Sequence, residues 1–269
     1  LAEAEQRHAQ HDGLALEHHG ATGLRASTLR DLGRYDAALV AYQASIDAES
    51  DPQSLLALWQ RVQRAQLWLV IGQAGRALQD LDAAQGGSDR PPWFRAGLLL
   101  TRALIAGARG QPMGRWLDEA DQVLPDDPAD FMVVQAGLLR AWAGAPAQPL
   151  LALAERCQYG GFALSLRWVA LQAALRAGQA GEARALAAAC DPLPDGLLKS
   201  GLLPRSVPQG VWWHGLWQAW HQLGEPGRAE AARAEGLAWL HRTLQRELAA
   251  QFHAAFRDQV PAHRALLAG

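Results

Sequence analysis

The chain is short of the residues that build disulfides, metal clusters and membrane spans. Its 269 residues include only two cysteines, Cys157 and Cys190, which are too few for a disulfide framework or a zinc site. No apolar run approaches the roughly 20 residues that cross a bilayer, and no signal-peptide pattern opens the chain. These absences predict a protein of the reducing cytoplasm with no membrane partner.

Lysine and a strong net charge are also missing. Lys199 is the only lysine, and it lacks the glycine-rich run of a nucleotide-binding P-loop. The net charge of −2 argues against a broad phosphate-binding surface, so we expect no direct contact with nucleic acid. We also find no nucleophile with a matched base and orienting acid. The sequence therefore predicts that the chain is not an enzyme and carries no cofactor.

Histidines gather near the start of the chain without forming a metal motif. They are His8, His11, His18 and His19. Gly13 interrupts the helix that would place His11 and His18 on one face, and no carboxylate stands at a zincin-like spacing. A solvated helix surface is therefore the better interpretation, and we expect no metal.

What the chain does have is a repeated turn between two helices. An apolar helix, a glycine and an alanine-rich helix recur around Gly33, Gly72, Gly110, Gly144, Gly178 and Gly224. The intervals are 39, 38, 34, 34 and 46 residues, and a period near 34 is typical of a helix–turn–helix tetratricopeptide unit. Glycine ends a helix in the left-handed conformation, and proline two residues later suits the first turn of the next helix. Such prolines are Pro112, Pro146 and Pro226.

These features predict an all-α fold, a right-handed α–α superhelix of about six hairpins. The hairpins are expected at about 14–50, 52–86, 93–125, 128–158, 160–190 and 208–250. Small residues seven before and five after the glycine would allow close packing: Ala26, Ala65, Ala103, Gly137, Ala38, Ala77, Ala183 and Ala229. We expect the last helix to run to about Phe252 as a C-terminal cap, with the array at 1–250 and a tail at 251–269 packed on or beyond it.

One long connection interrupts the period. Residues 191–209 contain four prolines and lengthen the last interval. A loop or short helix packed on the array is the simpler interpretation. The alternative is a lid over the groove.

Two segments resemble known families. Leu32-Gly33-Arg34-Tyr35-Asp36-Ala37-Ala38-Leu39 resembles a tetratricopeptide turn and second helix, and the later units resemble the degenerate repeats of bacterial signalling (STAND-type) ATPases and of LuxR- or SARP-like transcription regulators. The run from Phe256 to Leu267 is similar to the segment that often closes such proteins. It has Gln259-Val260-Pro261-Ala262-His263-Arg264 where that segment usually carries Asn-Pro-Val-Asn-Arg. The resemblance implies a bacterial sensor module with an ATPase or output domain upstream, and the chain starts at Leu1 rather than at methionine.

In tetratricopeptide arrays the first helix of each hairpin lines the concave groove. Offsets from each turn glycine predict a groove strip of aromatic rings and neutral polar groups: Arg30, Trp59, Gln63, Gln66, Gln135, Trp142, Trp168, Gln172, His214, Gln218 and His221. Such a strip suits an extended peptide, a partner helix or a sugar-like small molecule. The alternative is that half of these tryptophans pack between adjacent hairpins.

Four of the eleven tryptophans crowd into nine residues near the C-terminus. At 100° per residue, Trp213, Trp217 and Trp220 share one helix face, which is typical of a core stripe. Trp212 points elsewhere and is the better candidate for a ligand contact.

The sequence therefore favours a binding module of a larger bacterial regulator. In this hypothesis a protein or peptide partner, or a small-molecule inducer, binds in the groove and biases an upstream switch. The alternative is a free-standing adaptor that binds a partner peptide or helix. Capture of an acidic C-terminus is disfavoured, because only Arg30 and Arg176 supply positive charge at groove positions.

Overall fold

The computed structural model describes residues 15–86, 90–125, 131–146, 151–152, 160–191 and 207–269, and this part of the chain is helical without a strand. The helices are α2 (Ala15–Asp31), α3 (Tyr35–Asp47), α4 (Leu55–Val70), α5 (Ala74–Ala84), α6 (Pro92–Ala108), α7 (Gly114–Asp121), α8 (Phe131–Trp142), α10 (Gly160–Arg176), α11 (Ala180–Cys190), α13 (Gln209–Gln222), α14 (Pro226–Arg242), α15 (His253–Asp258) and α16 (Pro261–Ala268). The all-α class is thereby confirmed. Within the described ranges, no helix combines the length and the apolar character that a bilayer crossing requires.

The six predicted turn glycines have the expected backbone. Their φ angles lie between 69° and 113°, and no other described residue has a positive φ. The same two hydrogen bonds recur in all six turns. At the first turn, Arg34 N–H donates to Leu29 O and Gly33 N–H donates to Arg30 O, both at 2.9 Å. These bonds satisfy carbonyls that a helix end leaves free, so the left-handed glycine role is confirmed.

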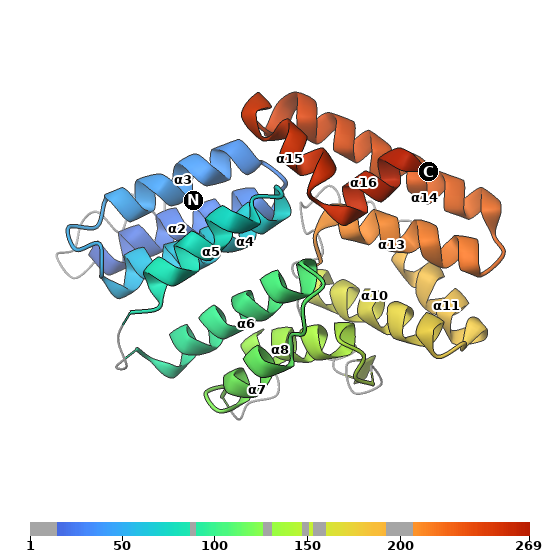
Figure 1. Cartoon of the computed structure of the whole chain (residues 1–269), viewed down its shortest axis with the longest axis horizontal. Helices are drawn as coiled ribbons and strands as arrows, with labels where there is room; N and C mark the ends of the chain where they lie inside the picture. Colours follow the sequence, from blue (N-terminus) through green and yellow to red (C-terminus); the bar gives the residue numbers. More distant parts are fainter. Residues whose placement is uncertain (1–14, 87–89, 126–130, 147–150, 153–159, 192–206) are drawn as a thin grey trace.

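The helices pack as consecutive hairpins. The pairs α2/α3, α4/α5, α6/α7, α10/α11 and α13/α14 lie against each other, and α8 packs between α6 and α10 (Figure 1). The first helices α2, α4, α6, α8, α10 and α13 also contact one another in sequence. The alanines predicted at close contacts are almost fully buried: Ala26, Ala65, Ala103, Ala38, Ala77, Ala183 and Ala229. A right-handed superhelical path stays a prediction.

The last long helix ends earlier than expected. Helix α14 continues through a π-helical segment, Thr243–Glu247, and stops where Leu248 turns extended at φ −140° and ψ 127°. A short 3-10 helix, Ala250–Phe252, then leads into α15. The expected helix to Phe252 is therefore interrupted five residues before its predicted end. Helix α16 packs against α13 and α14.

The segment 247–263, which we call the clasp, brings the end of the chain to its first two hairpins (Figure 1). Ala249 N–H donates to the Asp36 carboxylate at 2.9 Å. The ring centroid of Phe252 lies 5.7 Å from that of Trp68, and the ring of Phe256 lies 6.1 Å from that of Tyr35. The last unit of the array thus contacts the first two, and the array returns on itself.

Several sequence predictions fall outside the described residues. They are His8, His11, the bulk of the 191–209 connection and most of the second helix of the fourth hairpin. His18 and His19 lie in α2, but the structure does not describe their side chains.

Candidate binding surface on the first helices

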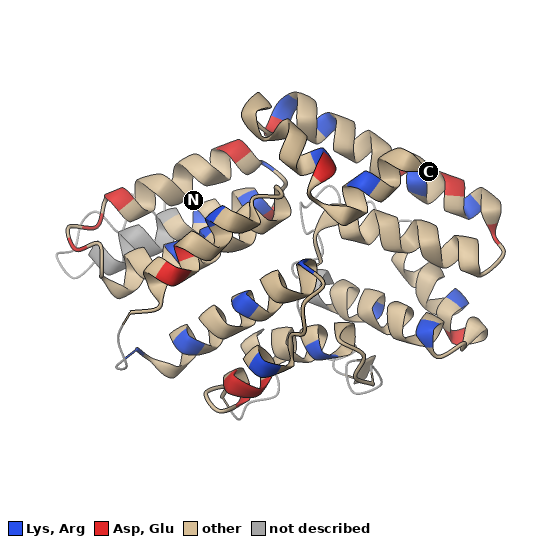
Figure 2. Ribbon diagram, viewed as in Figure 1, with Lys and Arg blue, Asp and Glu red and all other residues tan. Residues whose placement is uncertain are grey.

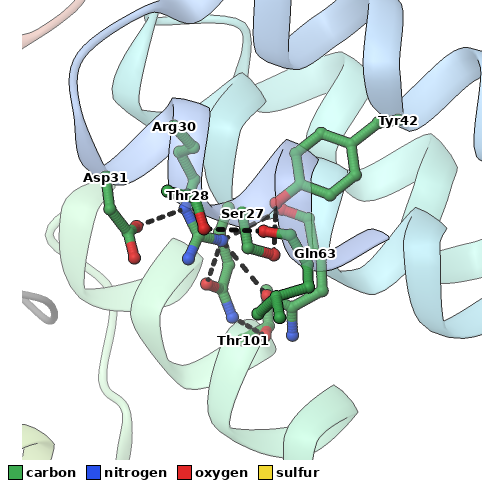
Figure 3. A network of polar contacts seen from close by, with 9 residues as sticks. Ser27, Thr28, Arg30, Asp31, Tyr42, Gln63 and Thr101 are labelled. Carbon is green, nitrogen blue, oxygen red and sulfur yellow. Dashed lines mark hydrogen bonds and ion pairs between the residues drawn. The ribbon is translucent and has the colours of Figure 1, made fainter. Parts of the chain in front are cut away.

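Three predicted groove residues from two first helices form one hydrogen-bonded network, shown with its neighbours in Figure 3. One nitrogen of Arg30 on α2, Nη1, donates to Gln63 Oε1 at 3.2 Å and to Gln66 Oε1 at 3.0 Å, both on α4. Gln66 Nε2 donates to Thr101 Oγ1 on α6 at 3.0 Å. We call Arg30, Gln63, Gln66 and Thr101 the polar row, because they link α2, α4 and α6 in turn.

The polar row mainly serves the protein's own packing. Only 11% of the Arg30 side chain is exposed, and its Nε also donates to the Asp31 carboxylate at 3.0 Å. Thr101 is fully buried, and its hydroxyl donates a hydrogen bond to Gly97 O at 2.8 Å. A ligand that bound to this row would have to replace bonds already made between the helices.

A second group of predicted residues is held by aromatic contact. The Trp142 and Trp168 ring centroids lie 6.3 Å apart, and Trp168 stacks on Trp212 at 6.2 Å with 26° between the planes. Trp168 Nε1 also donates to Trp212 O at 3.4 Å. We call Trp142, Trp168 and Trp212 the aromatic row, which links α8, α10 and α13. Figure 2 shows that α13 carries no charged side chain.

The aromatic row is core rather than surface. Trp168 is 3% exposed and Trp212 is fully buried, whereas Trp142 is half-buried. The Trp168 ring lies on Gly215 of α13, where an added Cβ would come within 2.5 Å of the ring. Trp212, which the helix-face argument singled out as a ligand contact, therefore packs between hairpins. Trp213 and Trp220 are buried as the core-stripe interpretation predicts, whereas Trp217, the third ring of that stripe, is half-buried.

The remaining predicted polar residues do not converge. Gln135 is buried at 8% exposure, and Gln172 is half-buried beside Gly215. His214 is half-buried with its ring 5.7 Å from that of Trp217, and burial lowers the pKa of His214. Gln218 and His221 are exposed on α13. These residues therefore lie in different environments and do not form one site.

The accessible aromatic surface lies at the start of α4 and α6. Trp59 is half-buried, and its ring meets that of Trp93 edge-on at 5.1 Å and 81°. Trp93 is 42% exposed. The Trp59 ring lies on Gly97 of α6, as Trp168 lies on Gly215. We call Trp59 and Trp93 the aromatic edge.

Sequence reasoning found only half of this edge. Trp93 lies outside the offsets that define the groove strip, because it sits in the first turn of α6. Its spacing to Gly97, four residues later, places both on one helix face and could have identified it.

No catalytic or metal-binding group emerges from the described residues. No cluster of three potential metal ligands is found among them. Cys190 is fully buried, and burial raises the pKa of its thiol to about 12, so it is a poor nucleophile. The buried His263, which sequence reasoning did not single out, contacts only the protein's own core: its Nδ1 bonds to Phe256 O at 2.7 Å and its ring lies 5.3 Å from that of Trp239.

Comparison of the chain with protein families, with curated proteins and with solved structures finds no match.

Proposed function

We propose that this chain is a tetratricopeptide-like binding module of a larger bacterial regulatory protein, either a transcription regulator or a signalling ATPase. The proposal includes a right-handed superhelical path and a cytoplasmic setting. A protein segment or a small inducer binds to the first-helix surface and biases the upstream switch. The turn and tail segments that resemble such regulators support this placement.

The observation that carries the proposal is the exposed ring of Trp93, held edge-on by Trp59. A tryptophan ring offers a large apolar area, and its contact with a second ring lowers the entropy cost of ordering it on binding. Tryptophan is also among the residues that most often dominate binding energy. The polar row and the aromatic row offer a ligand less accessible surface and fewer free polar groups, because their members are mostly buried or bonded to one another.

A display selection tests the binding role. Peptides selected on the wild-type chain, and hits from a metabolite panel, are measured by fluorescence polarisation or calorimetry against Trp93→Ala and Trp59→Ala. We expect each variant to weaken binding at least tenfold, since truncating a hot-spot residue costs about 2 kcal/mol or more. Trp116→Ala is the matched control, because that ring lies on α7 between Arg102 and Arg115. Ligands whose affinity is unchanged in both edge variants would refute the site.

The regulatory part is tested on the full gene product. We expect a ligand found in this way to change nucleotide hydrolysis or DNA binding by the switch domain. A full product that encodes no switch domain would contradict this part and favour the free-standing adaptor.

A further inference from the structure

The third hairpin leaves part of its first helix uncovered on the outer side. Helix α6 has 17 residues, whereas its partner α7 has only 8. The side chains of α7 pack on the C-terminal half of α6, where Leu117 shares a core cluster with Leu100 and Ala103. Phe94 and Leu98, in the N-terminal half, belong to a different cluster. The short α7 therefore leaves a gap at the seam between two cores.

This gap is a groove of about 410 Å³, which we call the outer groove, formed by the end of α5, the first half of α6 and α7. Phe94 and Leu98 lie beneath it and are almost fully buried, so Leu99, which is half-buried, is its main accessible apolar side chain. Glu119 of α7 and Gln122, the residue that follows α7, form one wall. A volume of this size holds a few side chains of a partner.

Two guanidinium groups stand at the rim, and their charges are not neutralised by described residues. Arg90 is held in place by neutral groups: Nε donates to Gly86 O at 2.8 Å, and the guanidinium lies 5.9 Å above the Phe94 ring. Arg95 is exposed and makes no ion pair within the described residues. The carboxylate of Glu119 is already paired with Arg115 at 2.9 Å. Figure 2 shows basic but no acidic positions along α6.

We propose that the outer groove docks an acidic, amphipathic segment of a partner protein. An apolar side chain of the segment covers Leu99, and its carboxylates bind Arg90 and Arg95. Carboxylates suit these groups because a guanidinium binds them through paired, charge-assisted hydrogen bonds. An apolar floor between two helices is the usual seat of an amphipathic helix.

The outer groove and the aromatic edge meet at Phe94, whose ring lies 5.9 Å from that of Trp93 and 6.0 Å from that of Trp59. The charged side chain of the groove points elsewhere: Arg95 follows Trp93 by two residues in α6, so the two side chains point about 160° apart around the helix. The proposal therefore does not rest on binding at Trp93, and one site can exist without the other.

The test uses a fluorescein-labelled, helix-forming peptide of about 12 residues with glutamates on one face and leucines on the other. Two further peptides replace the glutamates by lysines or the leucines by serines. We expect only the glutamate–leucine peptide to bind the full chain. Arg95→Gln and Arg90→Gln should each raise its Kd about tenfold, the size of one lost charge-assisted contact. Arg25→Gln, at an exposed arginine of α2, should leave the Kd unchanged.

Hydrogen exchange locates the bound peptide. Protection over residues 90–99 and over α7 is expected, and Leu99→Ser should weaken binding without unfolding the chain because Leu99 is only half-buried. Equal binding of the lysine peptide, unchanged affinity in both arginine variants, or no binding at all would overturn the proposal. Protection over Trp59 in place of α7 would overturn it too, while leaving the proposed function intact.

Discussion

The two halves of the array join their first helices by different chemistry. In the N-terminal half, α2, α4 and α6 are linked by the hydrogen bonds of Arg30, Gln66 and Thr101. In the C-terminal half, α8, α10 and α13 are linked by rings: Trp142 meets Trp168 edge-on, and Trp168 stacks on Trp212. The helices follow one another in the same order in both halves. The N-terminal half adds a row of polar bonds to the ring contact of Trp59 with Trp93, whereas the C-terminal half has buried rings in that place.

The two halves also differ in how much of an equivalent tryptophan stays accessible to a ligand. Trp59 and Trp168 both lie on a glycine of the next first helix, Gly97 and Gly215. Trp168 is then covered by Trp212, whereas Trp59 is flanked by the exposed ring of Trp93. A tryptophan packed on a glycine is therefore core in one half and accessible surface in the other. The ring beside it, Trp212 or Trp93, makes the difference.

The largest expected effect separates a buried tryptophan, Trp168, from an exposed one, Trp93. Trp168→Ala should lower the free energy of unfolding by about 3–5 kcal/mol, because it removes a buried ring and leaves a cavity beside Gly215. Trp93→Ala should cost clearly less, because its ring is 42% exposed and loses only its edge-on contacts with Trp59 and Phe94, worth about 0.5–1.5 kcal/mol each. Urea unfolding followed by circular dichroism measures both. Equal losses would mean that the aromatic row and the aromatic edge do not differ in burial.

The C-terminal half should also be the acid-sensitive one, through His263. Its Nδ1 must donate to the Phe256 carbonyl, which leaves Nε2 without a hydrogen-bond partner inside the core. Burial lowers the pKa of His263 from its usual 6.5 to about 4. As the pH falls, the unfolded chain binds the proton first. The contribution of this group is therefore complete above pH 6.5 and is lost as the pH falls to about 4.

The loss amounts to about 3 kcal/mol, at roughly 1.4 kcal/mol per pKa unit. The measurement is urea unfolding of the wild type and of His263→Asn at pH values from 7 to 4. Asparagine can keep a donor for the Phe256 carbonyl but does not titrate, so the difference between the two curves should shrink as the pH falls. His241→Asn, at an exposed histidine of α14, is the control. Parallel curves for wild type and His263→Asn would contradict the prediction.

Breaking the polar row should cost less than breaking the aromatic row. Arg30→Met keeps the apolar stem but removes the donor to Gln63 and Gln66, so we expect a loss of about 1–3 kcal/mol. Adding Gln66→Met should restore part of this loss, because it removes one of the acceptors left unpaired. A double variant with the full sum of the single losses would show that the two side chains act independently.

The turns were predictable from sequence, and the side-chain surroundings were not. A left-handed glycine is a local requirement, so Gly33 and its five equivalents could be identified from the recurring pattern of an apolar helix, a glycine and an alanine-rich helix. Exposure depends instead on which side chains of other helices arrive nearby. The offset argument grouped Trp59 with Trp168, and each ring meets a ring of the next hairpin. Trp168 meets the buried ring of Trp212, whereas Trp59 meets the exposed ring of Trp93.

The clasp lay beyond sequence reasoning for the same reason. Asp36 and Ala249 are 213 residues apart, and no local pattern connects them. The helix ends at the extended Leu248 without a proline or glycine, directly before the Ala249 N–H that donates to Asp36. Long-range contacts of this kind are set by packing, and packing is not periodic in the sequence.

The smallest expected effect concerns how the clasp holds the two halves together. Asp36→Ala removes the acceptor of the Ala249 N–H at the start of the 3-10 helix, where a capping bond is worth about 1 kcal/mol. Arg34→Ala removes only an exposed ion pair with Glu247, 3.4 Å long, and should cost a few tenths of a kcal/mol at most. Native-state hydrogen exchange separates local opening from global unfolding. We expect Asp36→Ala to speed exchange in α15 more than in α10, because the clasp would detach from the first hairpin while the aromatic row stays packed. Equal acceleration in both helices would mean that the clasp and the aromatic row unfold as one unit, and that the two halves differ in chemistry but not in cooperativity.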